Sequence, residues 1–336
     1  MARLPSNLAA LFTQALKTFE SSDSTFRILC SLPSTPSSSS PLPAEPPARP
    51  PRYIFVLDSS FNPPTLAHRR MVLSALSDPR YHAPAPRGTE SNERRSTSET
   101  PGASSSSSRV LLLLAINNAD KAPKPASFPQ RLAMMYAFAQ DVLASSLRKQ
   151  AGEAQSGISC EAVDIAVTTE PYFHAKARAI GTSTYYHGVE GADTPEGAAN
   201  AVVAEQVYLT GYDTLIRIFN PKYYPDNSMK TALDPFFAHA RLRVTMRTDD
   251  DWGDEAAQVA YLEELRAGML EAVGGRVEWV DKIDLVHGRT GDEAVVSSTK
   301  VRDAVRRRDW EGLGELVSEG VIGWIRENEL YAGDDR

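Results

Sequence analysis

Apolar and polar positions form two different patterns along the chain. Short apolar runs such as Tyr53–Leu57 and Val110–Ile116 have the length and composition of buried parallel strands. The segments that follow them place apolar residues every three or four positions, which predicts helices over 66–77 and 129–148 and at Glu255–Arg266. Further strands are expected near 162–168, 206–210, 242–247 and 276–280.

This alternation of strands and helices predicts the fold class. It implies right-handed crossovers and an α/β domain with a Rossmann-like, doubly wound parallel sheet. We expect that domain to span residues 52–331. In such a sheet, ligands bind beyond the carboxyl ends of the strands, so residues directly after strands are the first candidates for a site.

The segment before the domain, residues 1–32, is expected to be an amphipathic helical extension. Apolar residues recur at helical spacing over 6–20, which indicates a helix that docks on the domain. A mitochondrial targeting segment is the alternative, but Glu20 and Asp23 argue against it, because such segments are poor in acidic residues.

Two stretches are rich in proline and serine and have no apolar periodicity. Residues 33–51 are interpreted as a linker, and residues from about 79 to 108 as a disordered surface insertion. An insertion of this length is tolerated because the entropic cost of closing a loop rises slowly with its length.

Composition narrows the classes of function. Lys and Arg number 36 against 43 Asp and Glu, a net charge of −7, which argues against a broad nucleic-acid-binding face. The longest apolar run, Val110–Ile116, is too short to cross a bilayer, so we expect no membrane span. Cys30 and Cys160 lie far apart and show no metal-binding spacing, which favours a reducing intracellular compartment. We expect the cytoplasm or the nucleus, with the mitochondrion as the less favoured alternative. No pattern indicates an oligomeric state.

The first candidate site follows the first strand of the domain, in the sequence Asp58-Ser-Ser-Phe-Asn-Pro-Pro-Thr-Leu-Ala-His68. A strand, a turn and a helix start occur here in order, and the amino terminus of a helix favours an anion. Thr65 and His68 are three positions apart and share a face of the first helical turn. The candidate phosphate-binding residues of the turn are Ser59, Ser60, Phe61 and Asn62. The alternative is a packed turn with no ligand.

A second candidate site opens a helix near the carboxyl terminus, in the sequence Val296-Ser-Ser-Thr-Lys-Val-Arg302. The hydroxyls of Ser297, Ser298 and Thr299 suit phosphate oxygens at a helix start. Lys300 and Arg302 add charge-assisted hydrogen bonds. Taken alone, this pattern is equally typical of an ordinary helix cap with surface cations.

Together the two motifs resemble the nucleotidylyltransferases that carry His-x-Gly-His or Thr-x-x-His, and in particular the eukaryotic and fungal nicotinamide mononucleotide adenylyltransferases. The resemblance covers about residues 53–77 and 110–331 and is specific at the two phosphate motifs. Ser59 stands where these enzymes usually have glycine, and Ala67 replaces a second glycine. A fungal branch of adenylyltransferase-like proteins shares Asp-Ser-Ser-Phe-Asn-Pro-Pro-Thr.

The resemblance implies further site residues. Gly211 and Asp213 match an element that contacts the nucleotide ribose, although Asp213 could instead cap a helix. Lys121 and Lys124 match a phosphate-binding loop, with a solvated lysine pair as the alternative. The tryptophan-containing segment that holds the nicotinamide ring does not align, so Tyr172 and Phe173 are the candidate ring contacts, with core packing as the alternative.

The resemblance also implies a reaction, the transfer of AMP from ATP to nicotinamide mononucleotide, which gives NAD and pyrophosphate without a covalent enzyme intermediate. His68 would contact the α-phosphate, Thr65 the triphosphate, and Lys300 with Arg302 the pyrophosphate. Mg²⁺ would be held mainly by phosphates rather than by a protein metal site. The alternatives are transfer to another phosphomonoester, a catalytically silent nucleotide-binding regulator, and a scaffold that uses its proline-rich linker.

Overall fold

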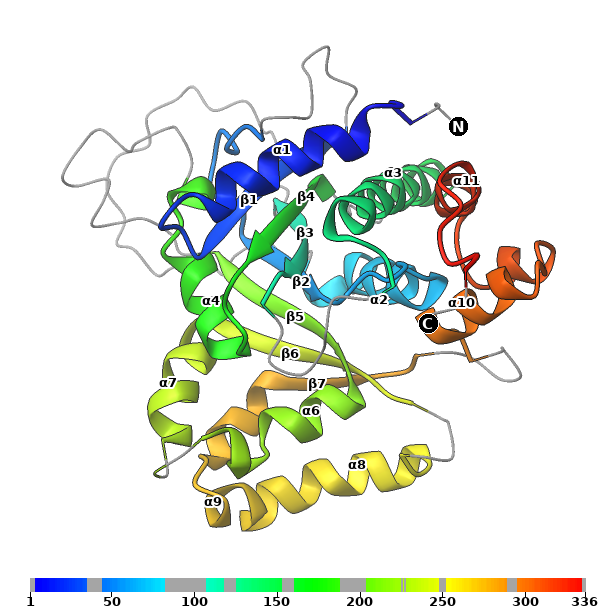
Figure 1. Ribbon diagram of the computed structural model, residues 1–336. Helices are drawn as coiled ribbons and strands as arrows, with labels where there is room; N and C mark the ends of the chain where they lie inside the picture. Colours follow the sequence, from blue (N-terminus) through cyan, green and yellow to red (C-terminus); the bar gives the residue numbers. More distant parts are fainter. Residues whose placement is uncertain are drawn as a thin grey trace.

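The computed structural model describes residues 4–34, 44–81, 107–117, 125–152, 160–187, 204–224, 226, 228–247, 252–288 and 295–333. At its centre is a seven-stranded sheet in the order β1-β4-β3-β2-β5-β6-β7 (Figure 1). The strands are β1 Phe26–Pro33, β2 Tyr53–Asp58, β3 Ser108–Ala115, β4 Cys160–Thr168, β5 Glu205–Gly211, β6 Ala240–Thr245 and β7 Ile283–Val286.

Six of these strands are parallel, and only β1, at the edge of the sheet, pairs antiparallel with its neighbour β4. From β2 the chain builds outward through β3 and β4 to one side and then through β5, β6 and β7 to the other. The direction of strand addition therefore reverses beside β2, where a doubly wound sheet leaves a crevice for ligands. The fold class predicted from the sequence is confirmed.

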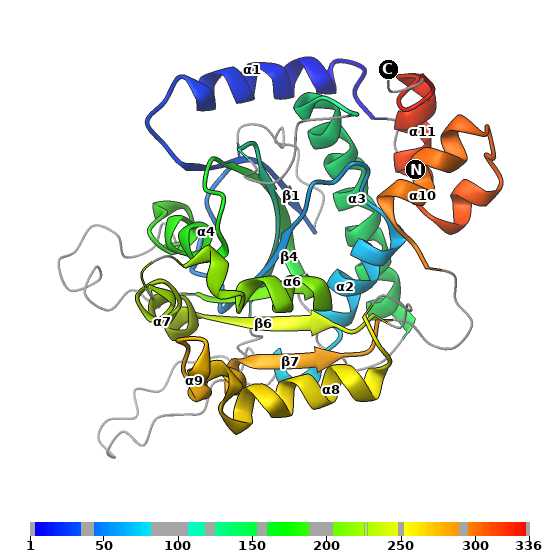
Figure 2. The same cartoon turned by 60° about the horizontal axis from the view of Figure 1, so that its bottom comes forward.

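Helices cover both faces of the sheet, and each face has its own apolar core (Figures 1 and 2). One face carries α1 Leu8–Glu20, α2 Leu66–Leu76, α3 Phe128–Gly152, α10 Ser298–Arg306 and α11 Glu319–Glu327. The other carries α4 Phe173–Gly181, α6 Tyr212–Ile218, α7 Met229–His239, α8 Glu255–Glu264 and α9 Leu270–Ala272. Within the described ranges, no helix has both the length and the apolar character needed to cross a membrane.

Strand prediction was incomplete at both edges of the sheet. The strand β1 was not predicted, and it brings the segment after α1 into the sheet. The strand expected near 276–280 was wrong, because Val277–Lys282 forms a 3₁₀ helix and β7 begins at Ile283. Trp279 and Val280 of that run are nevertheless buried, with the Trp279 ring stacked 5.3 Å from the ring of Phe237. A short apolar run indicates burial but does not distinguish a strand from a helical turn.

The expected insertion has structured ends. Pro79–Tyr81 forms a 3₁₀ turn, and the ring of Tyr81 packs edge-on against Tyr53 and Phe55, each at 5.1 Å. At the other end, β3 already begins at Ser108. The rest of the insertion, residues 82–106, lies outside the described residues, as do residues 35–43 of the expected linker.

Candidate active site

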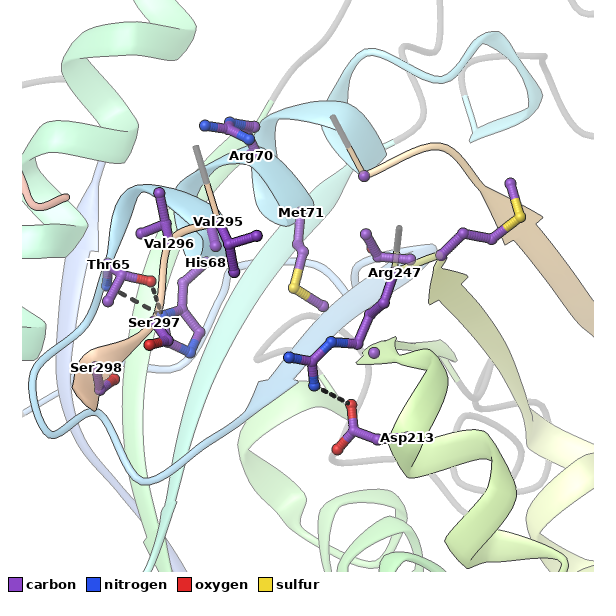
Figure 3. Close-up of a pocket in the computed structure, with 15 residues that line it drawn as sticks. Thr65, His68, Arg70, Met71, Asp213, Arg247, Val295, Val296, Ser297 and Ser298 are labelled. Atoms are coloured by element: carbon purple, nitrogen blue, oxygen red, sulfur yellow. Dashed lines mark hydrogen bonds and ion pairs between the residues drawn. The ribbon is translucent and has the colours of Figure 1, made fainter. Parts of the chain in front are cut away.

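A cavity of about 310 Å³ opens at the carboxyl ends of β5 and β6, beside the start of α2, the helix that follows β2 (Figure 3). Thr65, His68, Ser297 and Ser298 form one end of this cavity. Asp213 and Arg247 form the other end, with Met71 between the two groups. The cavity lies where strand addition reverses, so it occupies the expected ligand crevice of the fold.

His68 is oriented by the residue that caps its own helix. Thr65 is the extended N-cap of α2, and its backbone N–H donates a hydrogen bond to His68 Nδ1 at 3.0 Å. The Thr65 hydroxyl lies 2.8 Å from the same nitrogen. Because Nδ1 accepts from a backbone N–H, the hydrogen-bond network assigns the proton of the neutral ring to Nε2.

The second ring nitrogen, His68 Nε2, lies 3.0 Å from the hydroxyl oxygen of Ser59. Burial lowers the pKa of His68 from 6.5 to about 4, so the ring is neutral at pH 7. With its proton on Nε2, His68 donates toward Ser59 and cannot at the same time remove the Ser59 proton. The pair is therefore not arranged as a serine nucleophile with a histidine base.

The two sequence motifs are joined by direct hydrogen bonds. Ser298 Oγ donates to the Pro63 carbonyl at 2.8 Å, and Arg302 Nη1 donates to the Asn62 carbonyl at 2.9 Å. Ser297 is the N-cap of α10, and its hydroxyl accepts from the Lys300 N–H at 3.3 Å. The start of α10 is thereby held against the turn before α2.

This junction gives the cavity an electrostatic polarity. The amino termini of α2 and α10 both open at the end that contains Thr65, His68, Ser297 and Ser298. Each helix start carries a partial positive charge from its aligned peptide dipoles. Two such charges, together with several hydroxyl donors, suit a phosphate group.

The opposite end carries an ion pair. Arg247 Nη1 lies 3.3 Å from Asp213 Oδ1, and Figure 3 shows the guanidinium pointing toward that carboxylate. Asp213 lies in the first turn of α6, after the N-cap Gly211. A Cβ atom on residue 211 would lie 2.8 Å from Asp213 Oδ1, so an alanine there would require the Asp213 side chain to shift.

Arg247 was not among the residues predicted for the site. The backbone of Arg247 is held by Gln258, which is fully buried in α8. The Arg247 N–H donates to Gln258 Oε1 at 3.0 Å, and the Gln258 amide donates back to the Arg247 carbonyl. Arg247 is the last residue of the strand expected at 242–247. Its place at the end of a parallel strand, where ligands bind, could have identified it from the sequence.

The structure brings together some of the predicted site residues and separates others. Those that line the cavity are Thr65, His68, Gly211, Asp213, Ser297 and Ser298. Those that form the turn and junction behind it are Ser59, Phe61, Asn62 and Arg302. Ser60, Thr299 and Lys300 are exposed near the motifs. Lys121 and Lys124 lie outside the described residues.

The two aromatic candidates do not line this cavity. Phe173 packs against the ring of Tyr208 at 5.5 Å, and is partly buried in the core. Tyr172 is 43% exposed and stacks on His174 at 5.7 Å. Both lie at the start of α4, directly after β4 at the same edge of the sheet, so a role in binding a second substrate stays a prediction.

No carboxylate cluster suited to a metal ion was found among the described residues. Asp58, at the end of β2, accepts an ion-paired hydrogen bond from Lys176 at 2.5 Å. Its charge is therefore already compensated by a side chain of the protein.

Comparison with known proteins assigns the chain to a family. A Schizosaccharomyces pombe protein named "Putative nicotinamide mononucleotide adenylyltransferase" is 30% identical over 279 residues, which covers 83% of this chain and 86% of that protein. The chain belongs to the nicotinamide mononucleotide adenylyltransferase-like nucleotidylyltransferases. No model of a protein family matches the sequence.

Solved structures with a similar arrangement include two of the Plasmodium falciparum nicotinic acid mononucleotide adenylyltransferase. The complex with APC has 13% identity and a TM-score of 0.42, and the complex with NaAD has 14% identity and a TM-score of 0.38. Each alignment covers 83% of this chain and 97% of the other. Because both scores are low, the family assignment rests on the yeast relative.

Proposed function

We propose that this chain is an adenylyltransferase that joins AMP from magnesium-bound ATP to nicotinamide mononucleotide, giving NAD and pyrophosphate. The observation that carries the proposal is the convergence of two helix starts on one cavity, with Thr65 and His68 facing Ser297 and Ser298. Family membership supports the reaction class, and the name of the yeast relative supports the choice of acceptor.

The reaction is an in-line displacement at phosphorus. A phosphate oxygen of the mononucleotide forms a bond to the α-phosphorus of ATP, and the bond from that phosphorus to the bridging oxygen breaks. Pyrophosphate leaves with the bonding electrons, so no side chain has to act as a nucleophile. The protein contributes by positioning the substrates and by stabilising charge that develops on oxygen.

In this scheme His68 serves as a hydrogen-bond donor. Its Nδ1 is held by the Thr65 N–H, and its Nε2 proton, which points toward the Ser59 hydroxyl in the free protein, would pass its hydrogen bond to an oxygen of the α-phosphate. A neutral donor with a pKa near 4 keeps this role throughout the neutral range. The hydroxyls of Thr65, Ser297 and Ser298 would bind the remaining phosphate oxygens at the two helix starts.

The remaining site residues have supporting roles. Arg302 binds the Asn62 carbonyl, so it fixes the turn that receives the pyrophosphate, and the exposed Lys300 supplies further positive charge at that end. Asp213 would accept hydrogen bonds from the ribose hydroxyls, a task that suits a carboxylate. The Mg²⁺ ion would enter with ATP and keep mainly phosphate and water ligands. Tyr172, exposed at the start of α4, is the better candidate for the nicotinamide ring.

The experiment is an incubation of the purified protein with Mg-ATP and a panel of phosphomonoesters, namely nicotinamide mononucleotide, nicotinic acid mononucleotide and pantetheine phosphate. We expect pyrophosphate and NAD, with the highest kcat/KM for nicotinamide mononucleotide. Preference for another acceptor would preserve the reaction class and change the substrate. Binding of ATP with no product from any acceptor would contradict catalysis and favour a nucleotide-binding regulator.

A further inference from the structure

Ser59 occupies a position where related nucleotidylyltransferases usually have glycine, and in this chain its side chain contacts His68. Ser59 Oγ lies 3.0 Å from His68 Nε2, while the opposite ring nitrogen is held by Thr65. A glycine could not make the first of these contacts. The serine therefore adds a second anchor to a ring that would otherwise be held at one nitrogen.

The anchor is itself fixed to the sheet. The Ser59 N–H donates to the carbonyl of Leu113 in β3 at 3.3 Å, and Ser59 follows directly after the last residue of β2. The ring of Phe61, fully buried, lies 5.7 Å from the His68 ring and supports one side of it. The hydroxyl thus holds a defined position relative to the strands.

We propose that Ser59 is a positioning residue that acts through His68. Its hydroxyl oxygen accepts the hydrogen bond of His68 Nε2 in the free protein and so holds the ring in one orientation at the wall of the cavity. The ring is then oriented before ATP binds, so only the acceptor of its Nε2 hydrogen bond has to change when a phosphate oxygen arrives, and an oriented donor can stabilise developing charge at little cost. The effect of Ser59 on turnover rests on the proposed adenylyl transfer, whereas its effect on the His68 ring does not.

A double-mutant cycle tests the link between the two residues. Turnover is measured for the wild type, Ser59→Ala, His68→Ala and the double variant, with Ser77→Ala, at the far end of α2, as the control. We expect Ser59→Ala to lower kcat about tenfold with little change in the Kd for ATP, a loss that corresponds to one hydrogen bond. In the His68→Ala background the same substitution is expected to have no further effect. An equal tenfold loss in both backgrounds would overturn the proposal.

A second measurement does not depend on catalysis. In ¹⁵N–¹H spectra of the wild-type protein, His68 is expected to carry its proton on Nε2, and this proton is expected to exchange with water at least tenfold more slowly than in Ser59→Ala. Equal exchange rates, or a proton on Nδ1 in the wild type, would contradict the positioning role. If Ser59→Ala does not fold, the tautomer measured in the wild type still tests the proposal, because a proton on Nδ1 would contradict it. Failure of adenylyl transfer with every acceptor would refute the proposed function and leave this readout unchanged.

Discussion

Lys176 Nζ lies 2.5 Å from Asp58 Oδ2, and the two side chains are only 6% and 9% exposed. The pair joins α4 to the carboxyl end of β2, one residue before Ser59. The Lys176 ammonium also lies 5.5 Å from the centre of the Phe173 ring. Because an isolated charge is costly to bury, each member of this pair depends on the other. The ion pair thus fixes α4, whose N-cap is Tyr172, relative to the turn that follows β2.

Removing one member of this pair should destabilise the fold. We expect Lys176→Met to lower the free energy of unfolding by about 3–5 kcal/mol, because it leaves the Asp58 carboxylate buried without its partner. The double variant Lys176→Met with Asp58→Leu should recover much of that loss. Urea unfolding measures the free energy of unfolding of both variants. The control is Arg266→Met, which breaks the exposed pair with Glu263 and should lower that free energy by less than about 1 kcal/mol. Equal effects of Lys176→Met and Arg266→Met would contradict this account.

His68→Ala should reduce turnover far more than it weakens ATP binding. The expected loss in kcat is about 10² to 10³, the usual effect of removing one preorganised donor to a developing oxyanion. Steady-state kinetics and the Kd for ATP separate the two quantities. Circular dichroism and melting curves must match those of the wild type, since His68 also accepts the Thr65 N–H. A folded variant with wild-type turnover would show that His68 has no role in the reaction.

Arg302→Ala should instead weaken both ATP binding and turnover. Its guanidinium holds the Asn62 carbonyl, so its removal loosens the turn that carries the site in the bound ground state as well as in the transition state. Arg306→Ala is the matched control, because Arg306 lies in the same helix and pairs with Asp303 instead. A drop in kcat for Arg302→Ala at unchanged Kd would argue against this role.

Stability should depend on pH through His68. The folded protein lowers the pKa of His68 from 6.5 to about 4, so between these values the unfolded chain binds more protons than the folded one. This contribution is fully present above pH 6.5 and is lost as the pH falls toward 4, by about 3 kcal/mol in total. His68→Gln should flatten the pH dependence of urea unfolding in this window, whereas Ser77→Ala, which removes no ionisable group, should leave it unchanged. The same slope in both variants would show that His68 is not the group responsible.

Gly211→Ala should weaken ATP binding through Asp213. The added Cβ would lie 2.8 Å from Asp213 Oδ1, so the carboxylate has to move away from its position beside Arg247. We expect a rise in Kd of about tenfold or more, in line with the loss of a hydrogen bond to a charged group. Gly323→Ala in α11 has open space around its Cβ and should bind ATP normally. Isothermal titration measures both, and an unchanged Kd for Gly211→Ala would exclude Asp213 as a ribose ligand.

The local parts of the site could be predicted from sequence. The turns at Thr65–His68 and Ser297–Ser298 are each encoded within a few residues, because N-cap chemistry is set by the residue at the helix start and those just after it. The parallel strands of the centre were predictable for a similar reason, since burial on both faces makes them continuous apolar runs. Their order in the sheet was implied by the fold class rather than by any one residue.

The contacts between distant segments could not be predicted in this way. β1 lies at an edge and owes its place to pairing with β4, which no local pattern specifies. Arg247 becomes part of the site only because β6 lies beside β5, which brings it to Asp213. The pairing of Lys176 with Asp58 spans 118 positions and joins two charged residues that, in sequence, indicate only exposed surface.

The junction between the two motifs has a consequence for how the chain acquires its site during synthesis. The hydrogen bonds from Ser298 to Pro63 and from Arg302 to Asn62 span 235 and 240 positions. Contacts of such high sequence separation carry a large loop-closure cost and tend to form late in folding. A nascent chain that has not yet emerged as far as α10 therefore lacks half of the residues that form the proposed phosphate-binding end of the cavity. In the proposed function, ATP would bind only the finished protein and stabilise it by mass action, so ATP binding would report completed folding.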